Sequence, residues 1–219
     1  MTGHKEVNNK SAEFAGFQVG ICFGHRGCAN RAVCDTGLAE DMRVRLRARN
    51  FKSFLEKIVP GDLKRHHEFR LSISDCPNAC SCPQIVDVGL IGACRPVVTE
   101  EACSCCGACV AACREGAIRL SGGVPQVDAA SCVACGKCVE VCPTGTLQAG
   151  TRGYRILVGG KLGRHPRLAT ELPGIYKREE VAGILDHWLD YYITHCREGE
   201  RLGEILARKD EAFLKKITA

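Results

Sequence analysis

Alternating apolar and polar residues mark four short segments of this chain as strands. The clearest are Phe17–Ile21 and Phe69–Ser74, in which every second side chain is apolar over much of the run. Ile85–Leu90 and Tyr154–Val158 are shorter apolar runs, and Gly159-Gly160 closes the second of them. We therefore predict strands at these four places.

Longer stretches carry apolar residues at helical spacing. Leu38–Val59 is predicted as a helix that ends at Pro60-Gly61, because proline and glycine stop helices. Glu179–Cys196 is a strongly amphipathic helix, and Arg201–Phe213 is predicted to add another. Strands and helices in this order predict an α+β fold, with a mixed sheet and flanking helices.

Composition narrows the class of protein. Apolar residues make up 45% of the 219-residue chain, which is enough for a packed core. The polar start Met1–Lys10 does not resemble a secretory signal, and no apolar run reaches the roughly 18 residues that cross a bilayer. We therefore expect a cytoplasmic protein without a membrane partner, in which thiols serve metals rather than disulfides.

The charge and the low aromatic content argue against nucleic acid as a partner. The net charge is only +5, basic residues are spread along the chain, and aromatic residues account for 5%. Proteins that bind single strands use more aromatic rings for stacking. A basic pocket for a small anion remains compatible with this composition.

Seventeen cysteines are the outstanding feature, and they fall into three zones. The first two zones each follow a predicted strand, and the third repeats itself internally. We predict that residues 1–96 and 151–219 form one domain, which is interrupted by a small inserted domain at 97–150.

The third zone contains C-x2-C-x2-C-x3-C twice, which is the spacing of ferredoxin-type [4Fe–4S] ligands. Three closely spaced thiolates reach three iron corners of one cubane, and in two-cluster proteins the fourth ligand comes from the other motif. This resembles the bacterial two-cluster ferredoxins over about 45 residues. One predicted cluster is held by Cys103, Cys106, Cys109 and Cys142, and the other by Cys132, Cys135, Cys138 and Cys113.

Zinc or disulfides are the structural alternative for these cysteines. Zinc prefers pairs of ligands around a tetrahedron, which gives no reason for three cysteines plus a remote fourth, twice over. Cys105 lies inside the first motif but outside its spacing, and we interpret it as a spectator thiol.

The first two zones contain C-x5-C at Cys22 and Cys28, and then Cys76-Pro77-Asn78-Ala79-Cys80. Two loops that each follow a strand and each supply two thiolates can also bind one cubane. Here the chain resembles the sulfite and nitrite reductase family, whose signature is C-x5-C followed by C-x3-C. It is closest to the short dissimilatory-sulfite-reductase-like proteins. The runs Gly159–Leu168 and Arg197–Gly203 look like further segments of this family, so the resemblance covers roughly residues 16–207.

The resemblance implies a sulfite-reductase-like domain with siroheme and a third [4Fe–4S] cluster. Its ligands would be Cys22, Cys28, Cys76 and Cys80, with Cys80 also the proximal siroheme ligand and Asn78 facing the macrocycle. Cys28 and Cys34 have the same C-x5-C spacing, and we prefer the first pair because Cys22 directly follows a strand. Cys34, Cys82, Cys94 and Cys196 are interpreted as packed thiols.

The implied reaction is the six-electron reduction of sulfite to sulfide, with electrons passing through the ferredoxin clusters. Arg31 and Arg70 resemble the family's substrate-binding positions, whereas Glu68 stands where a second basic residue is expected. Arg26 lies inside the first cysteine loop, where it could tune the cluster or bind a cofactor carboxylate. Arg164 and Arg167 could pair with siroheme carboxylates or with acidic side chains of the protein.

Three alternatives stay open. Nitrite is reduced by the same chemistry, and another oxyanion or an organic sulfur compound could be the substrate. The chain could instead be an electron-transfer module without siroheme that docks onto a larger reductase. The chain corresponds to one half of the pseudo-symmetric family fold, so a second copy would complete the pocket, which predicts a homodimer. The remaining expected partner is an electron-donor protein or a reduced cofactor.

Overall fold

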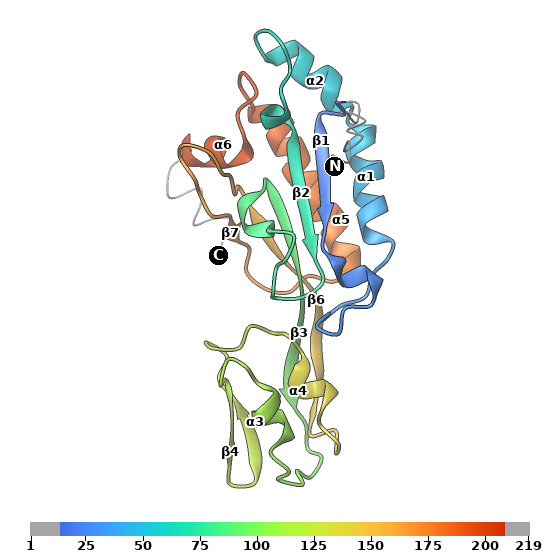
Figure 1. Ribbon diagram of the computed structural model, residues 1–219, viewed down its shortest axis with the longest axis vertical. Coiled ribbons are helices and arrows are strands. Elements are labelled where there is room, and N and C mark those ends of the chain that lie inside the picture. Colours follow the sequence, from blue (N-terminus) through green and yellow to red (C-terminus); the bar gives the residue numbers. More distant parts are fainter. Residues whose placement is uncertain (1–13, 209–219) are drawn as a thin grey trace, which may run out of the picture.

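The computed structural model describes residues 14–208, which form a five-stranded sheet and a separate two-stranded sheet (Figure 1). The large sheet has the order β1-β2-β3-β6-β7. β1, β2 and β3 are mutually parallel, whereas β6 and β7 are antiparallel to their neighbours. The strands of this sheet are β1 (Phe17–Ile21), β2 (Phe69–Ser74), β3 (Val88–Val98), β6 (Leu147–Val158) and β7 (Thr170–Glu171). The predicted α+β class with a mixed sheet is confirmed.

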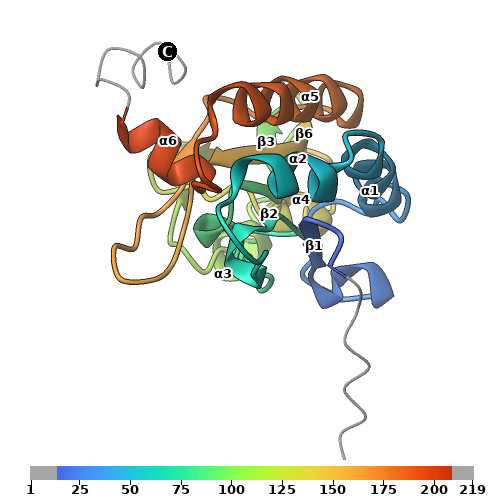
Figure 2. The same cartoon turned by 90° about the horizontal axis from the view of Figure 1, so that it is seen from above.

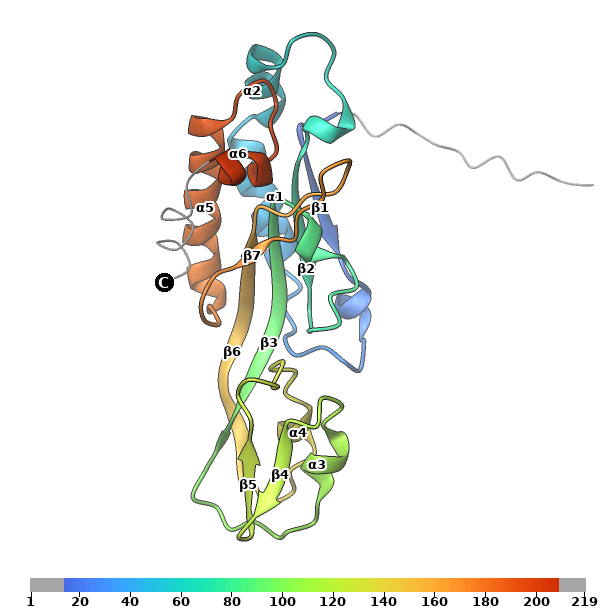
Figure 3. The ribbon, with the colours of Figure 1, turned by 90° about the vertical axis from the view of Figure 1, so that its left-hand side faces the viewer.

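Helices cover one face of the large sheet, as Figures 2 and 3 show. Within residues 14–208, no helix is long and apolar enough to span a membrane. The helices of this layer are α1 (Leu38–Ala48), α2 (Phe51–Ile58), α5 (Arg178–His195) and α6 (Leu202–Arg208).

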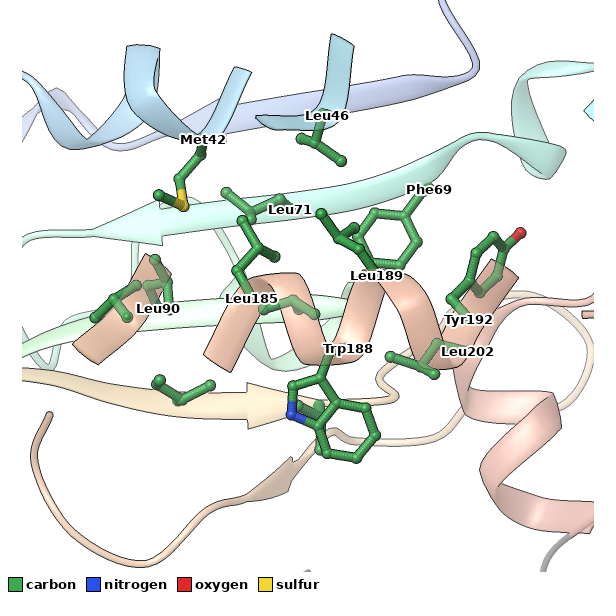
Figure 4. Packing of buried hydrophobic residues seen from close by; sticks show 14 of the residues in the cluster. Met42, Leu46, Phe69, Leu71, Leu90, Leu185, Trp188, Leu189, Tyr192 and Leu202 are labelled. Carbon is green, nitrogen blue, oxygen red and sulfur yellow. The ribbon is translucent and has the colours of Figure 1, made fainter. Parts of the chain in front are cut away.

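The main core lies between this helical layer and the sheet (Figure 4). Strand residues alternate between the two faces, so Phe69, Leu71 and Ile73 of β2 belong to this core. Phe69 packs edge-on against the buried ring of Tyr192 from α5, with the ring centroids 5.0 Å apart. Arg70, Ser72 and Ser74 consequently point to the opposite face.

Two predicted elements differ from the observed ones in an informative way. The predicted helix over residues 38–59 is two helices, and Asn50 between them has a left-handed φ of 46°. In an unbroken helix, Arg49 and Asn50 would lie on the same buried face as Leu46. The left-handed residue, which asparagine tolerates, shifts the phase so that Phe51 and Leu55 are buried instead.

The predicted strand over 85–90 begins too early. Residues Pro83–Ile85 form a 3-10 turn, η3, that lies over the sheet, and β3 starts only at Val88. A side chain at Gly89 would lie 2.1 Å from the carbonyl oxygen of Pro83, so this close approach requires glycine. The predicted strands at 17–21 and 69–74 are confirmed, and the helix predicted at 179–196 lies at Arg178–His195. Of the helix predicted at 201–213, α6 is observed, and its predicted remainder lies outside the described residues.

β3 and β6 are long enough to leave the large sheet and carry a second lobe (Figures 1 and 3). They pair antiparallel from Val88↔Val158 to Val98↔Leu147, with an irregularity between Cys94 and Pro96. The lobe contains α3 (Ala108–Ala112), α4 (Lys137–Glu140), β4 (Ile118–Ser121) and β5 (Val124–Val127). Both predicted domain boundaries fall within β3 and β6, and the division into domains stays a prediction.

A buried ion pair attaches α6 to the sheet. The fully buried carboxylate of Asp87 accepts two hydrogen bonds from the backbone, from Arg70 N at 2.8 Å and Leu202 N at 3.0 Å. It also pairs with the guanidinium of Arg201, with Nη2 2.6 Å from Oδ2. The segments before β3 and before α6 are therefore held together by charge in a dry environment.

We expect Asp87→Ala to lower the free energy of unfolding by about 3–5 kcal/mol, because it leaves the Arg201 charge buried and uncompensated. Denaturant unfolding of the purified protein measures this loss. Glu40→Gln is the control, since Glu40 pairs with Arg47 at the exposed surface and should change stability little. Equal stability of the Asp87 variant and the wild type would contradict this interpretation.

Candidate iron–sulfur and cofactor site

Four cysteines of the large domain lie at one edge of the sheet. Cys22 follows β1 directly, and Cys76 follows β2 after Asp75. Because β1 and β2 are parallel, their carboxyl ends meet at the same edge, and the Cys22 amide donates to Ile73 O at 2.9 Å. This edge faces the second lobe (Figure 1).

Short turns bring the second cysteine of each pair back to that edge. The 3-10 turn η1, Phe23–Arg26, precedes Cys28, whose amide donates to Gly24 O at 3.2 Å. A turn with Ala79 in the left-handed region leads from Cys76 to Cys80. We name Cys22, Cys28, Cys76 and Cys80 the strand-end quartet.

The strand-end quartet is compact enough for its charges to interact. Burial raises the pKa of Cys76, and the nearby sulfurs of Cys22, Cys28 and Cys80 raise it further. Cys34 and Cys82 are exposed, so the prediction that they are packed thiols is wrong for these two. Burial raises the pKa of Tyr154, and the nearby Asp35, Asp75 and Cys34 raise it further. The structure thus gathers the first of the two C-x5-C pairs around Cys76.

Backbone amides point at the sulfur of Cys22. The Gly24 and Asp75 amides lie 3.2 Å and 3.3 Å from Cys22 Sγ. Such N–H groups favour a thiolate and tune the potential of a cluster that it binds. The carbonyl of Asp75 accepts from the amides of Ala32 and Val33, at 2.8 Å and 3.2 Å, which ties the two cysteine loops together.

The second lobe contains two cavities, and each is lined by three cysteines of one motif and one of the other. Cys103, Cys106, Cys109 and Cys142 line the first, and we name them the outer quartet. Cys132, Cys135, Cys138 and Cys113 line the second, and we name them the inner quartet. This crossed arrangement matches the predicted ligand sets, while ligation itself stays a prediction.

The two motifs repeat their backbone conformation. Cys105 and Ala134 have left-handed φ values of 55° and 56°, and each stands one residue before a predicted ligand. Gly107 and Gly136 follow with φ of 73° and 75°, where glycine avoids the strain that a side chain would bring. Cys105 therefore takes the place that alanine has in the other motif, in agreement with a spectator role.

The cysteines of each lobe quartet are spread around a cavity. The structure contains no disulfide among residues 14–208. In the same residues, no three His, Cys, Asp or Glu side chains are close enough to share one metal ion. A cubane differs from a single ion because each thiolate binds a different iron, so its ligands are spread around a cavity. Amides of Ala117 and Leu147 approach Cys113 Sγ and Cys142 Sγ, both at 3.3 Å.

Burial affects the thiols of the two lobe quartets unequally. It raises the pKa of Cys138 to about 12, with the nearby Cys135 and Cys132 adding to the effect. In the outer quartet, backbone hydrogen bonds, first of all from the Leu147 amide, lower the pKa of Cys142. The burial of Cys138 must be offset by iron if it is to bind as a thiolate.

The inner quartet lies against the loops that carry the strand-end quartet. Its cavity, of about 420 Å³, is also lined by Asn30, Pro77 and Asn78 from the two strand-end loops. Asn78 is exposed beside this cavity, between Cys76 and Cys80. The cavity of the outer quartet has lining residues from the second lobe alone, apart from Leu147 at the start of β6.

The predicted arginines are distributed over three places. Arg26 and Arg31 are exposed on the loop after β1, and the Arg26 guanidinium lies 5.5 Å from the ring centroid of Phe23. Arg70 is the second residue of β2, at the end of the strand away from Cys76 and on the face opposite the helices. Its Nη2 donates to Arg65 O at 3.2 Å, and its Nε is buried without a hydrogen-bond partner. Glu68 beside it is buried and accepts from Gln18.

Arg164 and Arg167 lie at the end of the sheet away from the cysteine edge. They belong to the loop after β6, whose last residue Val158 pairs with the first residue of β3. Arg164 is exposed, whereas Arg167 donates to Gly159 O and Thr170 Oγ1, and burial lowers its pKa. The structure does not bring these two arginines to the cysteine edge.

Sequence reasoning missed Lys137 and Asn30 as residues of this site. Both line the cavity between the lobes, and Lys137 Nζ donates to the carbonyl of Ala29. These partners are 108 positions apart, and nothing in the spacing of the chain indicates such a contact.

The choice between the two C-x5-C pairs has a direct test. We expect Cys22→Ser to lose one cluster of four irons and Cys34→Ser to keep it, because Cys22 Sγ accepts from the amide of Asp75, directly before Cys76, at 3.3 Å. Iron analysis with Mössbauer spectroscopy of anaerobically purified variants measures this. The reverse result would assign Cys28 and Cys34 as the ligand pair.

Comparison with known proteins identifies the family of this chain. Residues 17–218 match the family described as the nitrite and sulphite reductase 4Fe-4S domain. The chain is 35% identical over 184 residues to the coenzyme F420-dependent sulfite reductase of Methanocaldococcus jannaschii, covering 83% of this chain and 28% of that protein. It is 31% identical over 103 residues to a polypeptide of the anaerobic sulfite reductase of Salmonella typhimurium, covering 47% of this chain and 26% of that one.

A solved structure shares the fold. The crystal structure of dissimilatory sulfite reductase I aligns with a TM-score of 0.58 at 19% identity, over 91% of this chain and 51% of that one. The chain spans little more than a quarter of the length of the curated relatives that it matches. With the family match covering nearly its whole length, the chain belongs to the nitrite and sulphite reductase 4Fe-4S domain family.

Proposed function

We propose that this chain is the siroheme-binding, iron–sulfur part of a sulfite reductase, which reduces sulfite to sulfide with six electrons. The observation that supports this most is the strand-end quartet, in which two separate loops bring four sulfurs to one sheet edge. A simple electron carrier with two ferredoxin clusters has no use for a third site of this kind.

The residues present fit the cofactors. Cys22, Cys28, Cys76 and Cys80 would hold a cubane, and Cys80, which is exposed, would also be the proximal ligand of the siroheme iron. Siroheme supplies an open iron position at which an oxyanion is reduced. Asn78 would lie next to the macrocycle, and Arg26 and Arg31 would bring positive charge to the same edge.

Arg70 is the arginine that is best placed to bind an anion. Its side chain lies on the sheet face opposite the helices, and its buried Nε has no protein partner. A guanidinium in such surroundings offers directed N–H donors to an oxyanion. Arg164 and Arg167, in the loop after β6, would serve cofactor carboxylates.

The two lobe quartets suggest an order of electron transfer. The inner quartet shares a cavity wall with the strand-end loops, and the outer quartet lies beyond it. Electrons from a donor protein or a reduced cofactor would thus pass from the outer to the inner and then to the strand-end quartet. In total, three [4Fe–4S] clusters would be present.

Sulfite is preferred to nitrite because the curated relatives described above are named sulfite reductases. Nitrite or another oxyanion is the second candidate. It is kept because Glu68 stands near Arg70, where the family resemblance predicts a basic residue. Burial raises the pKa of Glu68. A second copy of the chain would supply further basic residues, so we propose a homodimer.

Turnover of the anaerobically purified full chain tests the function. With a reduced viologen dye as donor, we expect sulfide from sulfite, and less ammonia from nitrite. A Soret band would accompany activity. Iron–sulfur absorbance without tetrapyrrole would instead support an electron-transfer module that docks onto a larger reductase.

A further inference from the structure

The contact between the two lobes includes one side chain that reaches from the inner quartet to the strand-end loops. Lys137 stands between Gly136 and Cys138, and its Nζ donates to the carbonyl oxygen of Ala29. Ala29 directly follows Cys28 of the strand-end quartet. The side chain is 26% exposed, so this contact is partly shielded from water.

We propose that Lys137 is a positioning residue, which fixes the separation of the inner and strand-end quartets and thereby the rate of electron transfer between them. This inference rests on the proposed function, since it takes both quartets to hold clusters. Electron tunnelling between two centres falls steeply with their distance, so a loop that drifts by a small amount slows the step.

The other contacts of the inner motif anchor it to β3. The Cys94 amide donates to Ala134 O at 2.7 Å. A Cβ on Gly136 would lie 2.8 Å from the Cβ of Cys94, which shows how closely the two backbones approach. These contacts hold the motif to the strand, whereas the loop around Cys28 is reached by Lys137.

Lys137 has two partners, so the effect of its ion pair can be tested separately from the effect of its hydrogen bond to Ala29. Besides Ala29 O, its Nζ pairs with the carboxylate of Glu140, at 2.6 Å, within the same helix α4. Glu140→Gln therefore removes a local ion pair and keeps the bond to Ala29. Lys137→Met removes both and retains most of the side-chain length, and Lys137→Arg retains a cation that can donate.

The loop around Cys28 reports on this contact without any substrate. The amides of Ala32 and Val33 are protected by hydrogen bonds to Asp75 O. In the iron–sulfur-loaded full chain, we expect Lys137→Met to raise hydrogen–deuterium exchange of these two amides about tenfold, which is about 1.4 kcal/mol of local opening. Glu140→Gln should exchange like the wild type, and Lys137→Arg should restore most of the protection.

A second readout concerns the clusters themselves. The magnetic interaction between the reduced inner and strand-end clusters, seen by electron paramagnetic resonance, should weaken in Lys137→Met and persist in Glu140→Gln. Iron content and cluster absorbance verify that the variants are loaded. Unchanged exchange and coupling in Lys137→Met, or equal changes in Glu140→Gln, would overturn the proposal. A wild type that carries the clusters but lacks siroheme would count against the proposed function and leave these comparisons intact.

Discussion

Cys80→Ala is expected to yield a folded protein that contains both lobe clusters but no siroheme. Cys80 would be shared between the cubane and the siroheme iron, so its removal breaks both attachments at once. Loss of residues that merely orient metal ligands already costs 10–100-fold in activity. We therefore expect sulfite reduction to fall by at least about 100-fold, the upper end of that range. Pyridine extraction of the tetrapyrrole, with iron analysis, measures the loss.

Two control variants make this result specific. Cys82→Ser changes an exposed thiol two positions further on, outside the strand-end quartet, and should keep siroheme and activity. Cys109→Ala should keep siroheme while blocking electron entry, because Cys109 lines the cavity of the outer quartet. Retention of siroheme in Cys80→Ala would refute the assignment of the proximal ligand.

Cys113→Ser is expected to lose the inner cluster, even though Cys113 belongs to the motif of Cys103, Cys106 and Cys109. The reason is the crossed arrangement, in which Cys113 shares a cavity with the cysteines of the other motif. About four irons should disappear, since one cubane holds four. Mössbauer spectra should show that the remaining lobe cluster is the one held by the outer quartet.

Cys105→Ser is the matched control, because it changes a thiol of the same motif that has no predicted ligand role. Its left-handed φ of 55° is retained by serine as readily as by cysteine. We expect full iron content in this variant. Loss of the outer cluster in Cys113→Ser, with the inner one retained, would contradict crossed ligation.

Local patterns predicted those parts of the fold that depend on neighbouring residues. The strands at 17–21 and 69–74 follow from alternation, and the helix at 178–195 follows from its apolar stripe. The position of the strand-end quartet could also be anticipated from the sequence, because each cysteine pair follows a strand that alternation identifies. The break at Asn50 was missed because asparagine is as compatible with a helix surface as with a turn.

Contacts between distant segments could not be predicted. Asp87 and Arg201 are 114 residues apart, and Lys137 lies 108 residues from Ala29. The length of β6 was also missed, because residues 148–152 are exposed and lack the apolar pattern that identifies a buried strand. The sequence also does not indicate that Arg164 and Arg167 lie away from the cysteine edge, because this depends on how distant segments pair in the sheet.

The most direct test of the proposed cofactor content is the amount of iron and tetrapyrrole in the anaerobically purified full chain. Three cubanes and one siroheme predict about thirteen irons per chain together with one extractable tetrapyrrole. About eight irons without tetrapyrrole would contradict it, since the strand-end sulfurs would then hold neither a cluster nor siroheme.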